Sequence, residues 1–402
     1  PRASAATDKP RNAPASPRVS ERASARKCTA ARNGQRLAWF WHGCAPMLAD
    51  VPANGGAPRV LFLYLQTTGA GHKSAAEAVS AALRVRRPEA ITRAVNVADY
   101  MSDTVRQIYH GSRALLIRQA PHVLGQLYEW SDGRRKRASV FDRVLHDIER
   151  SAFWRLLLEL DTSHWDAVVH THFFSPAVLA KPRDNGSKRP PEIVVTTDFM
   201  THRVWAHPAC ARTFVANEEA LDYLAHLGVP RSRLHRSGIP VHPQYAARRL
   251  PLEVFADRTR ARAAELARGE RPRITLMSTG FDGELAASLL TQLMGSEQPL
   301  SVLTVAGNSP ERERALNAVG VPRRHRVERL GHSSDVPAII ENSDLLIGKA
   351  GGLTSSEALA LGCPLLIVNP TPDQESQNTA WLLERGAALM GHHPPLVRTK
   401  IE

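Results

Sequence analysis

The chain reads Ile347-Gly348-Lys349-Ala350-Gly351-Gly352-Leu353-Thr354-Ser355-Ser356-Glu357-Ala358 where a buried-strand pattern ends in glycines and a helix pattern begins at once. Glycines let a backbone approach a phosphate closely, and the free N–H groups and positive end of the following helix bind it. Glu357 lies one turn further, where an acidic side chain can accept hydrogen bonds from ribose hydroxyls. A structural turn before a capped helix has the same spacing, so this segment alone leaves both interpretations open.

The residues around this segment alternate between strand and helix patterns. Strands are expected at residues 273–277, 300–305, 325–329, 345–347 and 364–368, with a further one at 387–390. Helices are expected between them, at residues 283–294, 311–319, 353–361 and 374–385. Alternation of this kind is typical of a parallel sheet covered by helices.

The first half of the chain opens with a similar unit. An apolar run at residues 60–65 indicates a buried parallel strand, a glycine turn follows at 68–72, and residues 74–86 predict an Ala-rich helix. Strand, glycine turn and helix in this order open a doubly wound domain. Further strands are expected at residues 91–97, 167–171, 192–197 and 212–215, with a mostly helical stretch from about 99 to 160.

Several polar residues follow these expected strands, at the edge where α/β proteins bind ligands. His72 lies at the start of the first helix, where the helix dipole disfavours the charged imidazole and leaves a usable base near neutral pH. A histidine beside an ordinary helix cap would look the same. His170-Thr171-His172 and Thr197-Asp198-Phe199-Met200-Thr201-His202 follow two other strands. Such a mixture is common by chance and no DxD motif is present, so no metal site is expected.

Two further segments of the second half carry polar groups. Met277-Ser278-Thr279-Gly280-Phe281 forms a second glycine turn that could donate backbone N–H groups to a diphosphate. Residues 369–378 follow an apolar strand and offer carboxylates and amides suited to a polyhydroxyl ligand. A Pro-rich loop with a helix cap explains the second segment equally well on composition alone.

Composition narrows the class of protein. The chain has 402 residues, of which 43% are apolar and 23% charged, as in a globular protein. Its net charge of +13 suits an anionic partner such as acidic lipid or a phosphorylated molecule, but also an Arg-rich proteome. No nucleic-acid-binding module is present, so a nucleic-acid partner is not expected. Four scattered cysteines without a CxxC pair argue against zinc and disulfides and fit a reducing cytoplasm.

These patterns predict an α/β protein with three parts. Residues 1–57 are rich in Ala, Pro, Arg and Ser without an apolar period, and we expect them to be disordered. Residues 58–245 and 246–402 are expected to form two Rossmann-like domains facing a cleft. Their junction is expected at about 239–252, where Ile239-Pro240-Val241-His242-Pro243 is Pro-rich and extended. No apolar run reaches the roughly 20 residues of a membrane-spanning helix.

Taken together, the motifs resemble the processive diacylglycerol glycosyltransferases and plant-type monogalactosyldiacylglycerol synthases, relatives of the lipid II-forming N-acetylglucosaminyltransferase. The resemblance covers residues 59–390 and agrees in order and spacing. Its carriers are Gly69-Ala70-Gly71-His72-Lys73-Ser74-Ala75, Asp166-Ala167-Val168-Val169-His170-Thr171-His172, Val195-Thr196-Thr197-Asp198-Phe199 with His202, Trp205-Ala206-His207-Pro208, Ser237-Gly238-Ile239-Pro240-Val241, the glycine–Glu357 segment, and Asn369-Pro370 with Gln374, Glu375 and Asn378. The turn at Thr67-Thr68-Gly69 has fewer glycines than many members of the family.

The resemblance implies a GT-B fold and an inverting transfer of a hexose from UDP-glucose or UDP-galactose to diacylglycerol, without a metal or other cofactor. The N-terminal domain would bind the lipid and the C-terminal domain the UDP-sugar. His72 would be the catalytic base. The donor-binding residues would be Gly280, Gly351, Gly352 and Thr354 for the diphosphate, Glu357 for the ribose, and Gln374, Glu375 and Asn378 near the sugar. Acceptor-side candidates are Gly71, His172, Asp198 and His202.

Two alternative functions stay open on the sequence. One is transfer of N-acetylglucosamine from its UDP derivative to a polyprenyl-linked acceptor. The other is a non-catalytic protein that binds nucleotide sugars, which the stop at Glu402 favours, because family members usually continue for several helices.

A lipid acceptor implies a protein of the cytoplasm that associates peripherally with the inner membrane and its anionic lipid. The expected docking surface is the basic run Arg134-Arg135-Lys136-Arg137 with Tyr128 and Trp130. A solvated charged loop has the same composition, so this assignment is a hypothesis.

Overall fold

The computed structural model describes residues 56–66, 70–101, 132, 153–179, 189–372 and 374–402. Nearly all of the segment expected to be disordered, residues 1–55, lies outside this part of the chain. The expected docking residues Tyr128, Trp130 and 134–137 also lie outside it, so both expectations stay predictions.

The first sheet contains six parallel strands in the order β2-β1-β3-β4-β5-β6. Its central strands are rich in Val, Leu, Ile and Phe, as is typical of parallel strands covered by helices on both faces. The strands are β1 (Arg59–Tyr64), β2 (Ile91–Asn96), β3 (Ala167–His170), β4 (Glu192–Val195), β5 (Arg212–Val215) and β6 (Leu234–Arg236). The described helices of this N-terminal half are α2 (Gly71–Arg86), α6 (Trp154–Thr162), α7 (Phe174–Leu179) and α8 (Glu218–His226), with short 3-10 turns η3 (Val97–Tyr100), η4 (Arg203–Trp205) and η5 (Arg231–Arg233).

The second sheet is also six-stranded and parallel, in the order β12-β11-β10-β7-β8-β9. Its strands are β7 (Arg273–Met277), β8 (Ser301–Val305), β9 (Arg326–Leu330), β10 (Leu345–Gly348), β11 (Leu365–Val368) and β12 (Ala388–Gly391). The helices of this C-terminal half are α10 (Leu252–Ala267), α11 (Gly283–Met294), α12 (Pro310–Asn317), α13 (Val336–Glu341), α14 (Gly352–Ala360), α15 (Gln374–Glu384) and α16 (Leu396–Ile401), with the 3-10 turn η6 (Ser278–Gly280). The predicted α/β class with two Rossmann-like sheets is confirmed.

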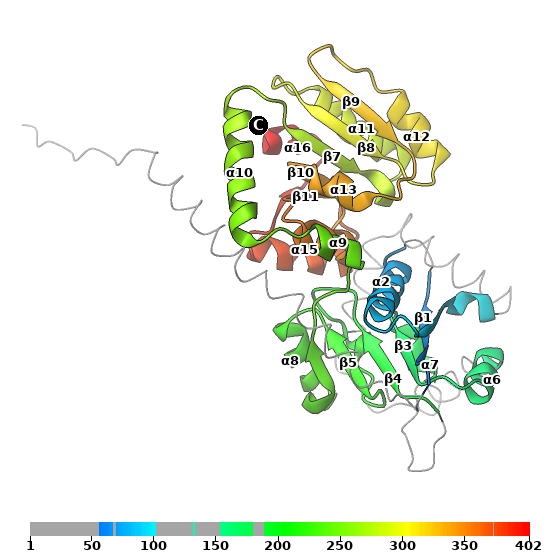
Figure 1. Ribbon diagram of the computed structural model, residues 1–402. Coiled ribbons are helices and arrows are strands. Elements are labelled where there is room, and N and C mark those ends of the chain that lie inside the picture. The colour runs from blue at the N-terminus through cyan, green and yellow to red at the C-terminus, as the bar shows by residue number, and fades with distance from the viewer. Residues whose placement is uncertain (1–55, 67–69, 102–131, 133–152, 180–188, 373) are drawn as a thin grey trace, which may run out of the picture.

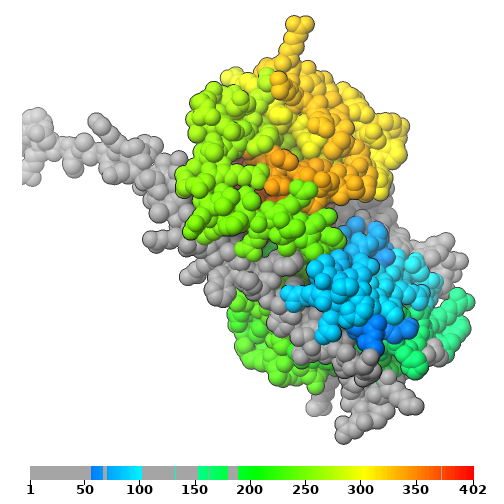
Figure 2. Space-filling model, viewed as in Figure 1, coloured from blue at the N-terminus to red at the C-terminus, as the bar shows by residue number. Residues whose placement is uncertain are grey.

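The two halves share one hydrophobic core. Phe199 and Ile239 of the N-terminal half belong to the same buried cluster as Leu353 and Trp381 of the C-terminal half. The Phe199 and Trp381 rings are stacked, with centroids 4.4 Å apart and an angle of 4° between their planes. In the ribbon view α9 (Pro243–Arg248) and α15 lie between the sheets (Figure 1), and in the space-filling view α9 and α2 meet where the halves join (Figure 2).

The linker between the halves contains a short helix that was not expected. Residues 239–242, expected to be extended, form no helix, and α9 (Pro243–Arg248) follows them. Proline at the first position of a helix needs no backbone donor, and His242 caps the helix by accepting from the Gln244 N–H. Pro243 therefore starts a short helix, which buries Tyr245 in the shared core.

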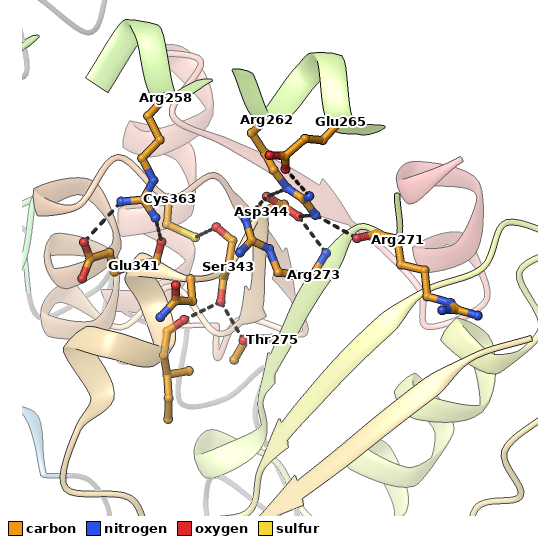
Figure 3. A network of polar contacts seen from close by, with 12 residues as sticks. Arg258, Arg262, Glu265, Arg271, Arg273, Thr275, Glu341, Ser343, Asp344 and Cys363 are labelled. Atoms are coloured by element: carbon orange, nitrogen blue, oxygen red, sulfur yellow. Dashed lines mark hydrogen bonds and ion pairs between the residues drawn. The ribbon is translucent and has the colours of Figure 1, made fainter. Parts of the chain in front are cut away.

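Helix α10 is attached to the second sheet mainly by polar contacts, since none of its residues is fully buried. Arg262 bonds both oxygens of Asp344, at 2.9 and 2.8 Å, and Asp344 also accepts from the Arg273 N–H at 2.7 Å (Figure 3). Burial alone would raise the pKa of Asp344, but the hydrogen bonds from Arg262 and Arg273 outweigh it and hold the pKa below its usual value. This network fixes α10 to the strand starts opposite the candidate site.

Candidate active site between the two sheets

His72 lies at the N-terminus of α2 and is held by two oxygens of the N-terminal half. Its Nδ1 lies 2.7 Å from the Thr171 carbonyl oxygen and 3.2 Å from Thr197 Oγ1. A carbonyl only accepts, so Nδ1 must carry the proton in the neutral ring, which places the lone pair on Nε2. Thr171 Oγ1 also donates to the His72 carbonyl oxygen at 2.7 Å. This orientation suits a histidine that accepts a proton at Nε2.

Aromatic rings surround His72 on one side. The His172 ring packs edge-on against it with centroids 4.5 Å apart, and Trp205 lies 6.4 Å away. His172 Nδ1 accepts from the Phe174 N–H at 3.0 Å, so the proton of its neutral ring is on Nε2. The structure therefore brings the predicted acceptor-side residue His172 directly to the predicted base.

The start of α14 meets this group from the other half. Gly351 precedes the helix and Gly352 is its first residue. A Cβ atom at residue 352 would overlap the Thr197 carbonyl oxygen, and a Cβ atom at Gly71 would lie 3.8 Å from Leu353. The glycine at 352 is thus required by a close approach between the halves. The N–H groups of the first turn of this helix lie next to the His72 region, and Thr354, two residues after Gly352, is partly buried.

Lys349 joins two predicted donor-binding elements and was not assigned from the sequence. Its Nζ lies 3.1 Å from Thr371 Oγ1 and 3.5 Å from Glu375 Oε2. Glu375 also accepts from the Thr371 backbone N–H and hydroxyl, both at 2.7 Å. The Lys349 stem covers Gly280, where a Cβ atom would lie 2.9 Å from its Cδ. The structure therefore places Gly280, Lys349 and Glu375 together, with Gln374 partly buried beside Glu375 at the start of α15.

Glu357 lies one turn into α14, beside the linker helix. Burial raises the pKa of its carboxyl to about 7, and a side-chain hydrogen bond with Tyr245 of α9 acts in the opposite direction. Burial together with the Glu357 carboxyl raises the pKa of Tyr245 well above its usual value. A partner that donates hydrogen bonds to this carboxyl, as ribose hydroxyls would, favours its ionised form and lowers its pKa.

Asn378 and Asp198 are in direct contact across the two halves. Asn378 is fully buried, and its Nδ2 donates to Asp198 Oδ1 and to the Ala350 carbonyl oxygen, both at 3.2 Å. Its Oδ1 accepts from the Phe199 N–H at 2.8 Å. Each polar atom of the Asn378 amide is therefore engaged in holding residues 198 and 199 against the C-terminal half. The donor contact predicted for Asn378 stays a prediction, and it would require these bonds to rearrange.

His202 makes a separate set of contacts, with Val204 and Asp132. It caps η4 by accepting from the Val204 N–H at 3.1 Å, and its Nε2 lies 3.7 Å from Asp132 Oδ1. Its role on the acceptor side stays a prediction. Within the described ranges, no group of three or more His, Cys, Asp or Glu side chains has the arrangement of a metal site.

Contacts between the halves thus place the predicted base His72, a glycine-rich helix start and a set of polar side chains in one region. Two family models match the chain on either side of the linker. The monogalactosyldiacylglycerol (MGDG) synthase family matches residues 72–241, and the glycosyltransferase family 28 C-terminal domain matches residues 278–392. Each half of the chain is therefore similar to one of these two glycosyltransferase families. The resemblance inferred from the sequence is confirmed.

Curated relatives agree with this assignment. The chain is 25% identical over 233 residues to the processive diacylglycerol beta-glucosyltransferase of Bacillus subtilis (strain 168), a match that covers 58% of each protein. It is 27% identical over 237 residues to the protein of that name from Bacillus thuringiensis (strain Al Hakam), covering 59% of this chain and 58% of the relative. The matches thus span less than two thirds of the relatives' length.

A solved structure establishes the fold. The crystal structure of Acinetobacter baumannii MurG aligns with a TM-score of 0.53 and 17% identity, over 86% of this chain and 89% of that one. The two parallel sheets and this likeness confirm the GT-B fold expected from the sequence. Among the described residues, no helix has the length and apolar character needed to cross a bilayer.

Proposed function

We propose that this protein transfers a hexose from UDP-glucose or UDP-galactose to diacylglycerol, with inversion at the anomeric carbon, at a membrane surface. The family domains and the names of the curated relatives support the substrate classes. The observation that carries the proposal is the meeting of His72 with the start of α14 through Thr197. A base from one half and a phosphate-binding helix end from the other are the two groups that such a transfer needs.

His72 is proposed to act as the general base on the acceptor. Its Nε2 takes the proton from the diacylglycerol hydroxyl as the oxygen attacks the anomeric carbon of the sugar. The Nδ1–H bond to the Thr171 carbonyl holds the ring in the tautomer that this step requires. Attack on the face opposite the leaving UDP converts an α-linked donor into a β-linked glycolipid, which agrees with the beta-glucosyltransferase name of the relatives.

The C-terminal half is proposed to bind the UDP-sugar donor. As the bond from the anomeric carbon to the diphosphate oxygen breaks, negative charge grows on UDP. The N–H groups at the start of α14 stabilise that charge without a metal ion, with Gly280, Gly351, Gly352 and Thr354 around the diphosphate. Glu357 binds the ribose, and Gln374 and Glu375 contact the sugar, with Lys349 holding Glu375 in place.

The experiment combines purified protein with vesicles of diacylglycerol and anionic lipid and with one UDP-sugar at a time. UDP-glucose, UDP-galactose and UDP-N-acetylglucosamine are compared, with polyprenyl-linked acceptors in parallel vesicles. Mass spectrometry identifies the lipid product, and the proton coupling at its anomeric carbon reports the linkage. We expect a β-linked hexosyl-diacylglycerol and no N-acetylglucosaminyl product.

Two other outcomes would replace the proposal. Transfer of N-acetylglucosamine to the polyprenyl acceptor, without transfer to diacylglycerol, would assign the neighbouring enzyme class. Measurable UDP binding by calorimetry with no transfer from any donor would indicate a non-catalytic protein that binds nucleotide sugars.

A further inference from the structure

Thr197 touches both sides of the candidate site. It follows β4 and is buried, with 4% of its surface exposed. Its Oγ1 lies 3.2 Å from His72 Nδ1, and its carbonyl oxygen occupies the space that a side chain at Gly352 would need. One residue therefore contacts the proposed base through its side chain and the first residue of α14 through its backbone.

The side-chain contact of Thr197 acts on the charged form of His72. The Nδ1–H already donates to the Thr171 carbonyl at 2.7 Å, and Thr197 Oγ1 is the second oxygen beside the same proton. When Nε2 accepts a proton, positive charge spreads over the ring and Nδ1–H becomes a stronger donor. The Thr197 hydroxyl oxygen then stabilises the ring in the state that forms during proton transfer.

The backbone around Thr197 contacts both halves. The next two residues, Asp198 and Phe199, bond to Asn378, and Phe199 stacks on Trp381. From the N-terminal half, Asn217 Nδ2 donates to the Phe199 carbonyl oxygen at 2.7 Å. With Gly352 packed against the Thr197 carbonyl, the C-terminal half contacts each of the residues 197–199, the segment that carries the hydroxyl beside His72.

We propose that Thr197 is a positioning residue that couples the seating of α14 against the N-terminal half to the orientation of His72. The inference rests on the proposed function, since it takes His72 as the base of the transfer. When α14 is seated, the Thr197 carbonyl meets Gly352 and its hydroxyl meets Nδ1. When the halves separate, the Thr197 carbonyl loses Gly352, and residues 198 and 199 lose Asn378 and Trp381, so the Thr197 hydroxyl is held less firmly beside Nδ1. Proton transfer is thereby favoured in the state in which the donor-binding helix is in place.

The kinetic test uses three substitutions at neighbouring positions. Thr197→Val removes the hydroxyl and keeps the shape, and Thr197→Ser restores the hydroxyl. Thr196→Val is the matched control, because Thr196 is adjacent and fully buried, and its hydroxyl has no hydrogen-bond partner among the described residues. Thr197→Val should lower kcat roughly tenfold, with KM for the UDP-sugar changed by less than about twofold. Thr197→Ser should keep most of the activity, and Thr196→Val should behave like the unchanged protein.

A second readout needs no turnover. Nuclear magnetic resonance of protein labelled with ¹⁵N in histidine reports the Nδ1–H signal of His72, assigned by its loss in His72→Ala. This signal should shift in Thr197→Val and also in Gly352→Ala, where the added methyl group pushes α14 away from Thr197. It should stay in place in Thr196→Val.

The outcomes separate the inference from the proposed function. An unchanged kcat in Thr197→Val, or equal losses in Thr197→Val and Thr197→Ser, would overturn the positioning role. An unshifted His72 signal in both Thr197→Val and Gly352→Ala would overturn it as well, even in a protein that transfers sugar. A protein without transfer activity whose His72 signal shifts as expected would remove the proposed function and keep the coupling.

Discussion

His72 and Glu357 carry opposite parts of the proposed chemistry, and the two differ in what surrounds them. His72 is tied to backbone and hydroxyl oxygens through Nδ1, which orients the ring. Glu357 is partly buried with Tyr245 beside it, and burial raises the pKa of its carboxyl to about 7. The first arrangement fixes a tautomer, and the second leaves a carboxyl whose charge changes near neutral pH.

Replacing His72 by Ala should abolish transfer while UDP still binds. Loss of a general base lowers kcat by roughly a hundredfold or more, whereas the UDP site lies in the other half. Steady-state transfer assays and calorimetry with UDP measure the two effects. His164→Ala, at an exposed histidine, is the control and should leave both values unchanged. Undiminished turnover in His72→Ala would remove the base assignment.

Changing Glu357 to Gln should alter how UDP affinity depends on pH. The ionised carboxylate accepts from ribose hydroxyls better than the protonated acid, so binding should strengthen as pH rises through about 7. The Kd of Glu357→Gln for UDP should be about tenfold higher than that of the unchanged protein at pH 8, and the difference should be smaller at pH 6. Comparing both proteins at each pH cancels the titration of UDP itself. A ratio of one at both pH values would leave Glu357 as a partly buried helix residue.

The same raised pKa has a consequence for stability. The folded protein binds the Glu357 proton more tightly than the unfolded chain does, so ionisation of this carboxyl opposes folding. Its contribution is favourable below the unfolded value near 4.5 and is lost as pH rises through about 7. The denaturation midpoint of Glu357→Gln, relative to that of the unchanged protein, should therefore rise between pH 5 and pH 8. A constant difference would contradict the raised pKa.

At the scale of elements, strands were easier to predict than contacts. Apolar runs predicted β1, β7 and β11 within a residue or two, because buried parallel strands leave a continuous apolar signature. Strand β6 was missed because its three residues, Leu-His-Arg, have no such run. Helix α10 was missed because its many Arg and Glu side chains obscure the apolar period and attach it through ion pairs.

The attachment of α10 gives a stability prediction. Asp344→Asn should lower the free energy of unfolding by about 2 kcal/mol at pH 7, since Arg262 and Arg273 lose a partly buried carboxylate. The pKa of Asp344 is lowered, so this contribution is present above the unfolded value near 3.8 and is lost as pH falls through the folded value. Urea denaturation at pH 7 measures the effect.

The matched control for that prediction is an ion pair on α10 itself. Asp257 pairs with Arg260 at the surface, and its side chain is 71% exposed. Asp257→Asn should change stability little, because exposed ion pairs contribute little. Equal effects of the two substitutions would show that burial of the Asp344 network adds nothing to the free energy of unfolding.

At the scale of the whole molecule, the sequence predicted two halves and not how they are joined. From the sequence, Asp198 was assigned to the acceptor side and Asn378 to the neighbourhood of the donor sugar. Phe199 belonged to a motif but had no assigned role. Their contacts with one another link positions about 180 residues apart, so spacing along the chain could not indicate them. Thr197 stood within a quoted motif, but its contacts with His72 and Gly352 join positions far apart in the sequence, so the motif could not indicate them.

Phe199→Ala should loosen the junction between the halves. It removes the ring stacked on Trp381 and leaves a cavity in the shared core. Small-angle X-ray scattering should report a larger radius of gyration, and transfer should fall. Phe153→Ala makes a comparable cavity inside the N-terminal half alone. That control should destabilise the protein without expanding it, and equal expansion in both variants would contradict a junction role for Phe199.

The most direct measurement of the proposed function is lipid analysis by mass spectrometry after expression in a bacterial host that makes no glycolipid. Two strains are compared, one with the unchanged protein and one with His72→Ala, at equal protein levels. A hexosyl-diacylglycerol should accumulate only in the strain with the unchanged protein. The same lipid in both strains would contradict His72 as the base, and no new glycolipid in either strain would contradict the transfer itself.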